Sequence, residues 1–374
     1  MTPASAAVNV LLDLRCLETP SAQRGIGRYA RELALSLPRA APDWSFAALS
    51  FGGVGAALGI ADVRYPGPRR GIGWADPWVL PGLFRRRRID LYHSTAYALP
   101  TAGARGTALV LTVHDLVAEL FPRALSLRHR LALRRTFRSA AAASRVITVS
   151  ETTRRDLLAR HPLPPERVVA IPNGVSSGFG DRGASVVSTG LPRPFLLYVG
   201  GLDLLKNVHF LLDVLECCRR AACTVDLVVA GEEGPRRLAF ERDAVRRGLG
   251  ARVHAVGFLP DERLAAAYRE AVAFVFPSRY EGFGLPPLEA MASGCPVLSS
   301  PAGALSEVLG AAAILCDPSD ASAWAREIAA LLANPSARTA LAGAGVRRAA
   351  SFTWERTARE TLAVYRAALA GAAA

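Results

Sequence analysis

The sequence lacks several features that define common classes of protein. Its 374 residues contain no stretch of 18 apolar residues free of charge, and no basic region precedes the first apolar run, so we expect neither a transmembrane helix nor a signal peptide. The six cysteines form no C-x-x-C pair and the histidines do not cluster near them, which argues against a disulfide framework or a zinc site. We therefore expect a soluble protein of the cytoplasm with free thiols.

Lysine is almost absent. Lys206 is the single lysine among 45 basic residues, and the remainder are arginine. The formal net charge of +13 suggests an anionic partner such as a nucleotide, a phospholipid surface or a nucleic acid. The abundance of arginine and alanine also fits a compositional bias without functional meaning. A nucleic-acid-binding or membrane-binding protein driven by charge alone therefore remains an alternative at this point.

Short apolar runs alternate with helical patterns along the first half of the chain. This alternation indicates a parallel sheet with helices on both faces, and hence the α/β class. The strands are predicted at residues 8–14, 45–51, 89–92, 108–113 and 146–149, with helices including 27–37 and 125–143.

The same alternation restarts in the second half. The strands are predicted at residues 195–199, 225–230, 253–256, 273–276 and 296–298, with a helix over 207–220 and a helical tail over 319–374. A segment rich in glycine, serine and proline separates the halves. We predict one domain over residues 1–180, a linker over 181–193, a second domain over 194–353 and a terminal segment over 354–374.

The strongest local signal begins where the strand predicted at residues 273–276 ends. The loop that follows contains Gly282, Phe283 and Gly284, and Pro286 favours a helix start directly after it. The N–H groups of Gly284 and Leu285 would then form an anion site suited to a diphosphate. Glu281 in the loop and Glu289 in the helix would accept hydrogen bonds from hydroxyl groups. Glu289 alone could equally be a carboxylate that favours its helix N-terminus.

Several ordered motifs together resemble the retaining glycosyltransferases of family 4, which have the GT-B fold. Residues 281–289 read EGFGLPPLE and resemble the family's E-x7-E motif, and residues 198–207 read YVGGLDLLKN and resemble its phosphate-binding loop. The other matching segments are RGIGRYA at residues 24–30, TVHD at 112–115, VSETTRRD at 149–156 and IPNGV at 171–175.

The resemblance implies a fold and a reaction. The fold would be two Rossmann-like domains facing a central cleft, with the terminal helix crossing back to the first domain. The second domain would bind a nucleotide diphosphate sugar and the first an acceptor. Transfer would retain the sugar's configuration and need no cofactor or metal. The sequence most resembles family members that build O-antigen or exopolysaccharide. This implies transfer of a hexose, with GDP-mannose favoured as donor, to a glycan or lipid-linked acceptor. The alternatives are a UDP- or dTDP-sugar donor, or a protein that binds sugar nucleotides without catalysis.

The resemblance also implies residue roles. Lys206 would hold the diphosphate, with Gly200 and Gly201 in its loop. Glu281 would contact the transferred sugar, Glu289 the ribose, and His114 the sugar from the first domain. Gly25 and Gly27 would let the backbone come close to the donor. The remaining implied donor contacts lie in the loop and at the start of the helix that follows it: Gly282, Phe283, Gly284 and Leu285.

Fixed positive charge is needed where a sugar–phosphate bond breaks, because negative charge develops on the leaving diphosphate. The sequence contains no D-x-D pair to hold a metal there, so Lys206 and the helix N–H groups are the candidates. Many family members carry an arginine at the position of Gly201 and a basic residue at that of Leu205. Either Arg24, Arg28 or Arg279 replaces them, or the positive field of the site is weaker. Of the three arginines, Arg279 is favoured because it lies two residues before Glu281.

Two other functions fit single motifs. Residues 25–30 match G-x-G-x-x-A of dinucleotide-binding proteins, but the loop before them is long and the second strand carries no acidic residue for a ribose. Paired glutamates also occur in glycoside hydrolases, where a diphosphate site would serve no purpose. Both are disfavoured.

Basic residues gather in two segments of the first domain. Residues 85–88 are four consecutive arginines, and Arg130, Arg134 and Arg138 recur on one face of the helix predicted at 125–143. With Leu127, Leu131 and Phe137 nearby, this face would suit the anionic inner surface of the cytoplasmic membrane. A solvated arginine face is an equally acceptable interpretation. We expect no nucleic-acid partner.

Overall fold

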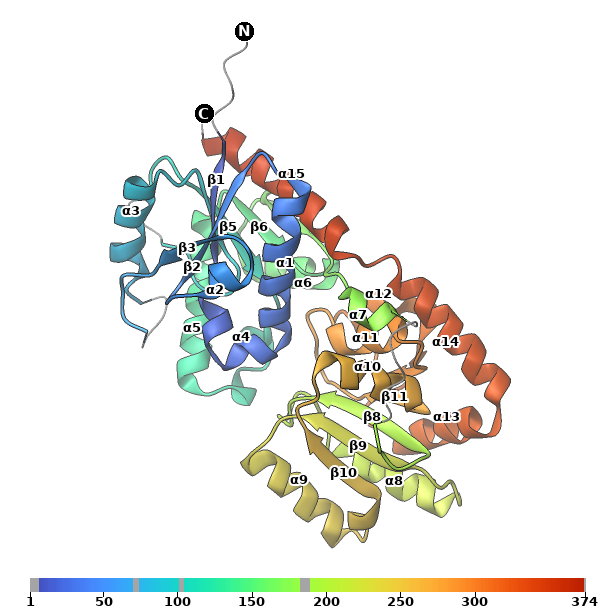
Figure 1. The fold of residues 1–374 in the computed structure, drawn as a ribbon. Coiled ribbons are helices and arrows are strands. Elements are labelled where there is room, and N and C mark those ends of the chain that lie inside the picture. Colours follow the sequence, from blue (N-terminus) through green and yellow to red (C-terminus); the bar gives the residue numbers. More distant parts are fainter. Residues whose placement is uncertain (1–6, 70–73, 101–103, 182–188, 373–374) are drawn as a thin grey trace. The chain divides into compact units, whose positions relative to one another are not determined.

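The protein is described by a computed structural model that covers residues 7–69, 74–100, 104–181 and 189–372. The chain forms two compact units, one of residues 1–174 with 353–374 (unit 1) and one of residues 175–352 (unit 2). Each unit is built on one parallel sheet flanked by helices (Figure 1). The predicted α/β class with two Rossmann-like parallel-sheet domains is confirmed.

The sheet of unit 1 has seven strands in the order β3-β2-β1-β4-β5-β6-β7, and every pair is parallel. The strands are β1 (Asn9–Asp13), β2 (Ser45–Ser50), β3 (Ala61–Arg64), β4 (Leu91–Ser94), β5 (Ala108–Val113), β6 (Arg145–Thr148) and β7 (Val168–Ala170). Central β5 is buried along its whole length, as an apolar strand covered on both faces must be. The strand order reverses between β1 and β4, and the carboxyl ends of neighbouring strands at such a point are where open α/β sheets bind ligands.

The helices of unit 1 cover both faces of this sheet. They are α1 (Gly25–Ala40), α2 (Val54–Ala57), α3 (Asp76–Arg87), α4 (Val117–Leu120), α5 (Leu127–Ser139), α6 (Glu151–Arg160) and α15 (Trp354–Ala372). Helices α1 and α15 lie side by side (Figure 1), and α15 also contacts β5 and β6. Apolar residues of α3 and α5 instead join one hydrophobic cluster that includes Leu11 and Leu111 of the sheet.

The sheet of unit 2 has six strands in the order β10-β9-β8-β11-β12-β13, again all parallel. The strands are β8 (Phe195–Gly200), β9 (Asp226–Gly231), β10 (Val253–Gly257), β11 (Ala273–Phe276), β12 (Val297–Ser299) and β13 (Ile314–Leu315). The helices are α7 (Ser177–Gly180), α8 (Phe210–Arg220), α9 (Pro235–Arg246), α10 (Asp261–Glu270), α11 (Leu285–Ala292), α12 (Leu305–Leu309), α13 (Ala321–Ala333) and α14 (Pro335–Ala349).

The boundary between the units falls slightly earlier than the predicted one at residue 180. Phe179 of α7 contacts the ring of Tyr268 in α10, and the N–H of Val175 donates to the carbonyl of Phe352, so residues 175–180 belong with unit 2. Most of the predicted linker, residues 182–188, lies outside the described residues. The terminal helix α15 belongs to unit 1.

Several elements differ from the sequence prediction at their ends. The helix predicted at 207–220 begins only at Phe210, and the one predicted at 125–143 becomes α5 followed by a short 3-10 turn. The predicted helical tail is broken twice. The first break is at Asn334, which caps a new helix that starts with Pro335, and the second lies between Ala349 and Trp354. Strands β3, β7 and β13 were not predicted; each is an edge strand of four residues or fewer, which is too short a run to be recognised from the sequence.

Among the described residues, no helix has both the length and the apolar character needed to cross a membrane. The six cysteines are free thiols, and three of them, Cys16, Cys218 and Cys295, are buried.

Candidate active site

The reversal of strand order in unit 2 lies between β8 and β11. Because these strands are parallel neighbours, the loops that follow them, residues 201–209 and 277–284, leave the same edge of the sheet. The two strongest sequence motifs occupy these two loops. The fold therefore brings them together although about 75 residues of chain lie between them.

Lys206 and Glu281 meet directly at this edge. The Lys206 ammonium Nζ donates to Glu281 Oε1 at 2.7 Å, and the side chains are 28% and 13% exposed. Nζ also lies 5.7 Å from the centroid of the Phe276 ring at the end of β11. The ion pair is thus half-buried against the Phe276 ring, and part of each side chain remains exposed to solvent.

The loop that carries Lys206 is held by its own backbone. Asp203 Oδ1 accepts from the N–H groups of Leu205 and Lys206, at 3.0 and 3.3 Å. The carbonyl of Leu205 in turn accepts from the N–H of Arg279 at 2.7 Å. This bond joins the two loops, and it places the exposed residue Arg279 beside the segment that presents Lys206.

Helix α11 starts immediately after the second loop. Gly284 is its N-cap with φ of 103°, and a Cβ there would lie 2.6 Å from Leu305 Cδ2, so both conformation and packing require glycine. Proline in the first turn fits the helix start, as predicted. Within the described part of the chain, the N–H groups of Gly284 and Leu285 donate no hydrogen bond, so both remain available to an anion.

Gly303 supports the Glu281 loop and was not identified from the sequence. Its φ is +61°, and a Cβ would lie 2.3 Å from the carbonyl oxygen of Glu281, which also accepts from the N–H of Ala304 at 2.9 Å. Only glycine allows this close backbone approach. The Pro-Ala-Gly sequence at residues 301–303 is a turn signal that could have located the bend, although not its partner.

The other predicted residues of this motif are largely enclosed. Gly282 and Phe283 are buried, and the Phe283 ring packs edge-on against Phe352. Glu289 lies inside α11 and is only 3% exposed. A buried carboxylate at this depth must be hydrogen-bonded, so Glu289 is part of the helix packing as well as a candidate ligand contact.

Gly201 stands among carboxylates. A Cβ at this position would lie 3.2 Å from Asp203 Oδ2 and 3.3 Å from Glu232 Oε2, and Glu232 also accepts from the N–H of Leu202. Gly200, at the end of β8, has φ of 150°. The position at which the family resemblance implied an arginine therefore carries no charge, and two acidic side chains lie close to it.

His114 of unit 1 follows β5, as predicted. Its Nε2 lies 2.7 Å from the carbonyl oxygen of Thr95, so Nε2 carries the proton and donates. Burial lowers the pKa of His114 to about 4, which keeps the ring neutral near pH 7 and leaves Nδ1 as an acceptor. The ring also contacts Tyr29 edge-on, with centroids 4.9 Å apart.

The glycine loop of unit 1 has an internal role. Helix α1 begins at Gly25, and a Cβ on Gly27 would lie 2.4 Å from the carbonyl oxygen of Ala22. Gly27 therefore allows α1 to pack on the preceding turn. The same helix carries Tyr29, whose hydroxyl bonds Thr112 Oγ1 at 2.9 Å and so joins α1 to β5.

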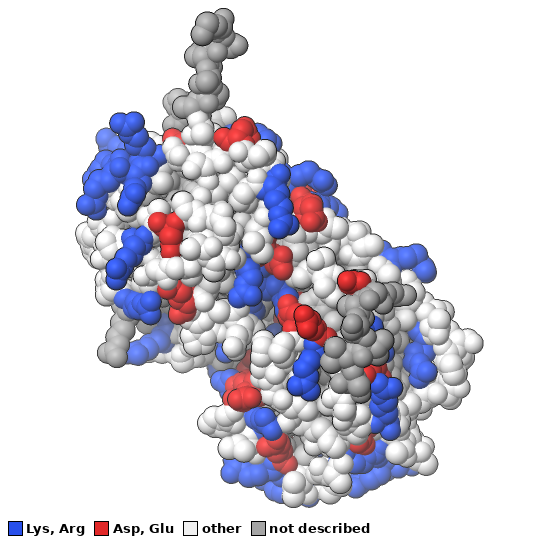
Figure 2. Space-filling view, in the orientation of Figure 1, with Lys and Arg blue, Asp and Glu red and all other residues white. Residues whose placement is uncertain are grey.

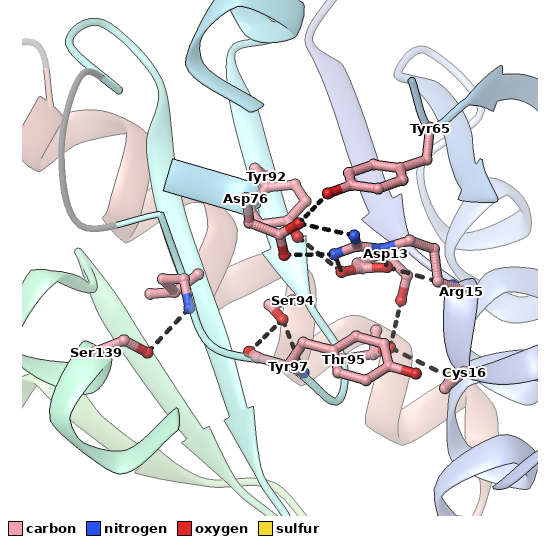
Figure 3. A network of polar contacts seen from close by, with 11 residues as sticks. Asp13, Arg15, Cys16, Tyr65, Asp76, Tyr92, Ser94, Thr95, Tyr97 and Ser139 are labelled. Carbon is pink, nitrogen blue, oxygen red and sulfur yellow. Dashed lines mark hydrogen bonds and ion pairs between the residues drawn. The ribbon is translucent and has the colours of Figure 1, made fainter. Parts of the chain in front are cut away.

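A buried ionic network in unit 1 was missed from the sequence (Figure 3). Arg15 lies between the carboxylates of Asp13 and Asp76, with its guanidinium bonded to both. The hydroxyls of Tyr65 and Tyr92 donate to Asp76 and Asp13, at 2.6 and 2.8 Å. The carboxylates raise the pKa of Arg15 above its usual value although burial opposes this. All five side chains are fully or nearly fully buried. The network therefore stabilises the fold of unit 1 and is not open to a ligand.

The structure therefore brings together Lys206, Glu281, Arg279 and the start of α11 in unit 2. His114 and the glycine loop belong to the corresponding edge of unit 1. In the ranges that the structure covers, no three or more His, Cys, Asp or Glu side chains are grouped so as to hold a metal ion.

Comparison with known proteins fits this arrangement. Residues 23–178 match the family described as Glycosyltransferase Family 4, and residues 187–348 match Glycosyl transferases group 1. The O-antigen chain mannosyltransferase B of Escherichia coli is 30% identical over 292 residues, which are 74% of each chain. The chain belongs to glycosyltransferase family 4.

Two further comparisons place this family 4 glycosyltransferase among its relatives. The MMP alpha-(1->4)-mannosyltransferase of Mycolicibacterium hassiacum is 35% identical over 237 residues, 61% of this chain but only 55% of the relative. The structure of Anabaena HepE in complex with UDP and glucose aligns with a TM-score of 0.76 at 20% identity, covering 95% of this chain and 99% of that one. The fold is thus GT-B, as predicted.

Proposed function

We propose that this family 4 glycosyltransferase moves a mannosyl group from GDP-mannose to a glycan or lipid-linked acceptor, with retention of configuration and without a metal. The observation that carries the proposal is the Lys206–Glu281 ion pair beside the open N–H groups of α11. The cation and the two backbone N–H donors suit the diphosphate of a nucleotide sugar, and the carboxylate at the same sheet edge suits the sugar hydroxyls.

The positive groups suit the leaving diphosphate. Cleavage of the bond between the anomeric carbon and the phosphate oxygen leaves the electron pair on that oxygen. The Lys206 ammonium and the N–H groups of Gly284 and Leu285 would stabilise this charge without reorganisation, because the loops already fix them. Lysine suits the task since its ammonium is a compact charge on a flexible stem that can leave Glu281 for a phosphate.

Glu281 would then accept hydrogen bonds from hydroxyls of the transferred sugar. In the free protein Lys206 neutralises it, and a bound diphosphate would compete for the same ammonium. Donor binding thus exchanges one ion pair for two interactions, one from Lys206 to phosphate and one from Glu281 to sugar. His114, neutral with an acceptor at Nδ1, would offer a further hydroxyl contact.

Arg279 would supply part of the charge that relatives obtain from an arginine at the Gly201 position. Its N–H is bonded to Leu205, so its exposed side chain starts close to the Lys206 loop. The acidic surroundings of Gly201 make this second charge more necessary, because Asp203 and Glu232 oppose the approach of a phosphate.

The names of relatives support mannose as the transferred sugar. Both the Escherichia coli and the Mycolicibacterium hassiacum relatives are mannosyltransferases, and the former acts on an O-antigen chain. A UDP-sugar is the competing donor, because Anabaena HepE is solved with UDP and glucose.

A thermal-shift panel of GDP-mannose, UDP-glucose, UDP-N-acetylglucosamine and dTDP-glucose tests the donor. A donor at 100 times its dissociation constant stabilises the folded chain by about 2.7 kcal/mol, so the cognate one should stand out clearly. GDP-mannose is expected to give the largest shift. A larger shift with a uridine or thymidine donor would contradict the donor assignment.

Turnover of the cognate donor with and without EDTA tests the rest of the proposal. We expect unchanged release of the nucleoside diphosphate in EDTA, and an axial anomeric product from an axial donor by NMR. Loss of turnover in EDTA would overturn metal independence. Donor binding without any release or transfer would instead identify a non-catalytic binding protein.

A further inference from the structure

Unit 1 exposes apolar and basic side chains together on α3 and α5. Trp78 of α3 is 80% exposed and Trp74, just before this helix, is 59% exposed. Leu127 and Leu131 of α5 are exposed as well. Within the described part of unit 1, these four are the large apolar side chains that are exposed at the surface. We call them, together with the arginines of residues 85–88 and of α5, the α3/α5 surface.

The two parts of this surface are physically joined. The Arg135 guanidinium of α5 lies over the Trp74 ring, 4.9 Å from its centroid. Beneath the surface, Phe84 of α3 and Phe137 of α5 belong to one hydrophobic cluster, which fixes both helices on the sheet. Phe137, expected from the sequence on the exposed face, is thus an anchor in the core.

No acidic side chain in the described part of the protein neutralises the charge of this surface. Four arginines at residues 85–88 and five in α5 form no ion pair with any described residue. The single carboxylate in the two helices is Asp76, which is buried against Arg15. Figure 2 shows basic side chains gathered over α3.

Helix α9 of unit 2 shows that the excess of arginine does not by itself create such a surface. It contains Arg236, Arg237, Arg242 and Arg246 and is followed by Arg247, and four of these five pair with nearby carboxylates. A compositional bias toward arginine is compensated there by acidic neighbours. On α3 and α5 no acidic residue among those that the structure describes provides such compensation, so the positive field of these helices extends into solvent.

We propose that the α3/α5 surface docks on an anionic lipid membrane, with the arginines at the head groups and Trp74, Trp78, Leu127 and Leu131 entering the interface. Tryptophan and arginine are the side chains that suit the boundary between head groups and acyl chains. Exposed tryptophan and leucine without acidic neighbours favour a bilayer over a nucleic acid, whose backbone offers no apolar phase. The inference does not depend on the proposed donor.

Vesicle binding tests the surface directly, without any enzymatic readout. The full chain is sedimented with vesicles of phosphatidylcholine alone, or with phosphatidylglycerol as about a third of the lipid. Binding is expected to the anionic vesicles only. Each arginine near such a surface contributes about fivefold, so Arg85→Gln/Arg87→Gln/Arg134→Gln should weaken partitioning by about 100-fold. These three side chains are exposed, so the fold should not change.

A matched variant in unit 2 provides the control. Arg242→Gln/Arg263→Gln/Arg269→Gln removes the same charge from exposed positions of α9 and α10. It should bind the vesicles nearly as the unmodified chain does. Equal weakening by both triple variants would show that net charge alone acts, and it would overturn the proposal.

Quenching of tryptophan fluorescence by brominated lipid tests insertion. Of the five tryptophans, Trp324 and Trp354 are buried, so quenching should come chiefly from Trp74 and Trp78. Trp78→Ala should lose at least half of it and lower partitioning several-fold. If no quenching occurs, or if duplex DNA competes the protein off the vesicles at equal phosphate, the surface is a polyanion site and the membrane proposal is wrong.

Discussion

Both units place ionic groups at the carboxyl edge of their sheet, yet the two groups differ in kind. In unit 1, Arg15 is completely buried and bonded to Asp13 and Asp76. In unit 2, Lys206 is partly exposed and bonded to Glu281 on a face that solvent reaches. The first is closed on every side by protein, whereas the second can exchange a protein partner for a ligand.

The difference in burial separates structure from chemistry. Removing one partner from a buried ion pair leaves an uncompensated charge in a low dielectric and is strongly destabilising. Removing one partner from a solvent-exposed pair changes stability by less than about 1 kcal/mol. Substitutions in the Arg15 network should therefore alter folding, and substitutions at Lys206 should alter turnover.

The largest expected effect is on stability, at Asp76. Asp76→Ala leaves Arg15 and the Tyr65 hydroxyl without one partner, and the free energy of unfolding should fall by about 4 kcal/mol in urea denaturation. Tyr65→Phe is the milder control, since it removes one hydroxyl, and should lower stability by about 1 kcal/mol. If Asp76→Ala unfolds like the unmodified chain, the network is not structural.

The next effect is on turnover, at Lys206. Lys206→Ala should reduce donor turnover by about 100- to 1,000-fold, because it removes the fixed charge facing the diphosphate. Its stability should fall less than that of Asp76→Ala, because the Lys206–Glu281 pair is only half-buried and Glu281 keeps contact with solvent. Lys206→Arg tests whether any positive charge suffices, and Glu281→Gln tests whether the carboxylate is needed. Full turnover in Lys206→Ala would contradict the proposed site.

A smaller effect concerns pH and another buried group of unit 1. His93 is enclosed between Tyr365 and Thr112, and burial lowers its pKa to about 3, against 6.5 in the unfolded chain. Between these values the unfolded chain binds a proton that the folded chain does not, so stability decreases as pH falls. At pH 5.5 the loss relative to pH 8 is about 1.4 kcal/mol for this histidine.

His93→Gln isolates that contribution. Urea denaturation at pH 5.5 and pH 8 should show a pH-dependent loss that is smaller in the variant by about 1.4 kcal/mol, because the variant has no imidazole at this position to take up a proton on unfolding. An unchanged difference between the two pH values would show that His93 is protonated in the folded chain.

The smallest effect sharpens the account of the missing arginine. Arg279→Ala should weaken donor affinity by about fivefold, the size of one partly exposed charge contact. Gly201→Arg should restore most of this loss, since the neighbours of its Cβ are the movable carboxylates of Asp203 and Glu232. A Gly201→Arg chain with unchanged affinity in both backgrounds would show that the diphosphate does not reach this loop.

The sequence predicted more of the fold than of the contacts within it. Runs such as residues 108–113 specify a buried parallel strand by themselves, whereas β13 has only two residues, too few to be recognised as a strand. The EGFGLPPLE motif located the α11 start because glycine and proline act locally. The partnership of Lys206 with Glu281 depends on strand order, which no local pattern contains.

The Arg15 network shows the same limit. Asp13 and Arg15 look like ordinary polar residues at the end of an apolar run, and nothing in the sequence connects them to Asp76, which is 61 positions beyond Arg15. Burial of Arg15 follows only when β1, β4 and α3 are assembled. Gly303 was missed for a similar reason, since its requirement comes from the Glu281 backbone 22 positions earlier in the chain.

Helix α15 has a consequence for the order in which the chain matures. It supplies Tyr365, the partner of His93, and Thr357, whose hydroxyl donates to the carbonyl of Pro172. Since α15 follows all of unit 2 in the sequence, the ribosome synthesises these residues only after unit 2. Unit 1 can therefore be completed only after unit 2 has been synthesised, and until then α1, β5 and β6 lack the helix that packs against them.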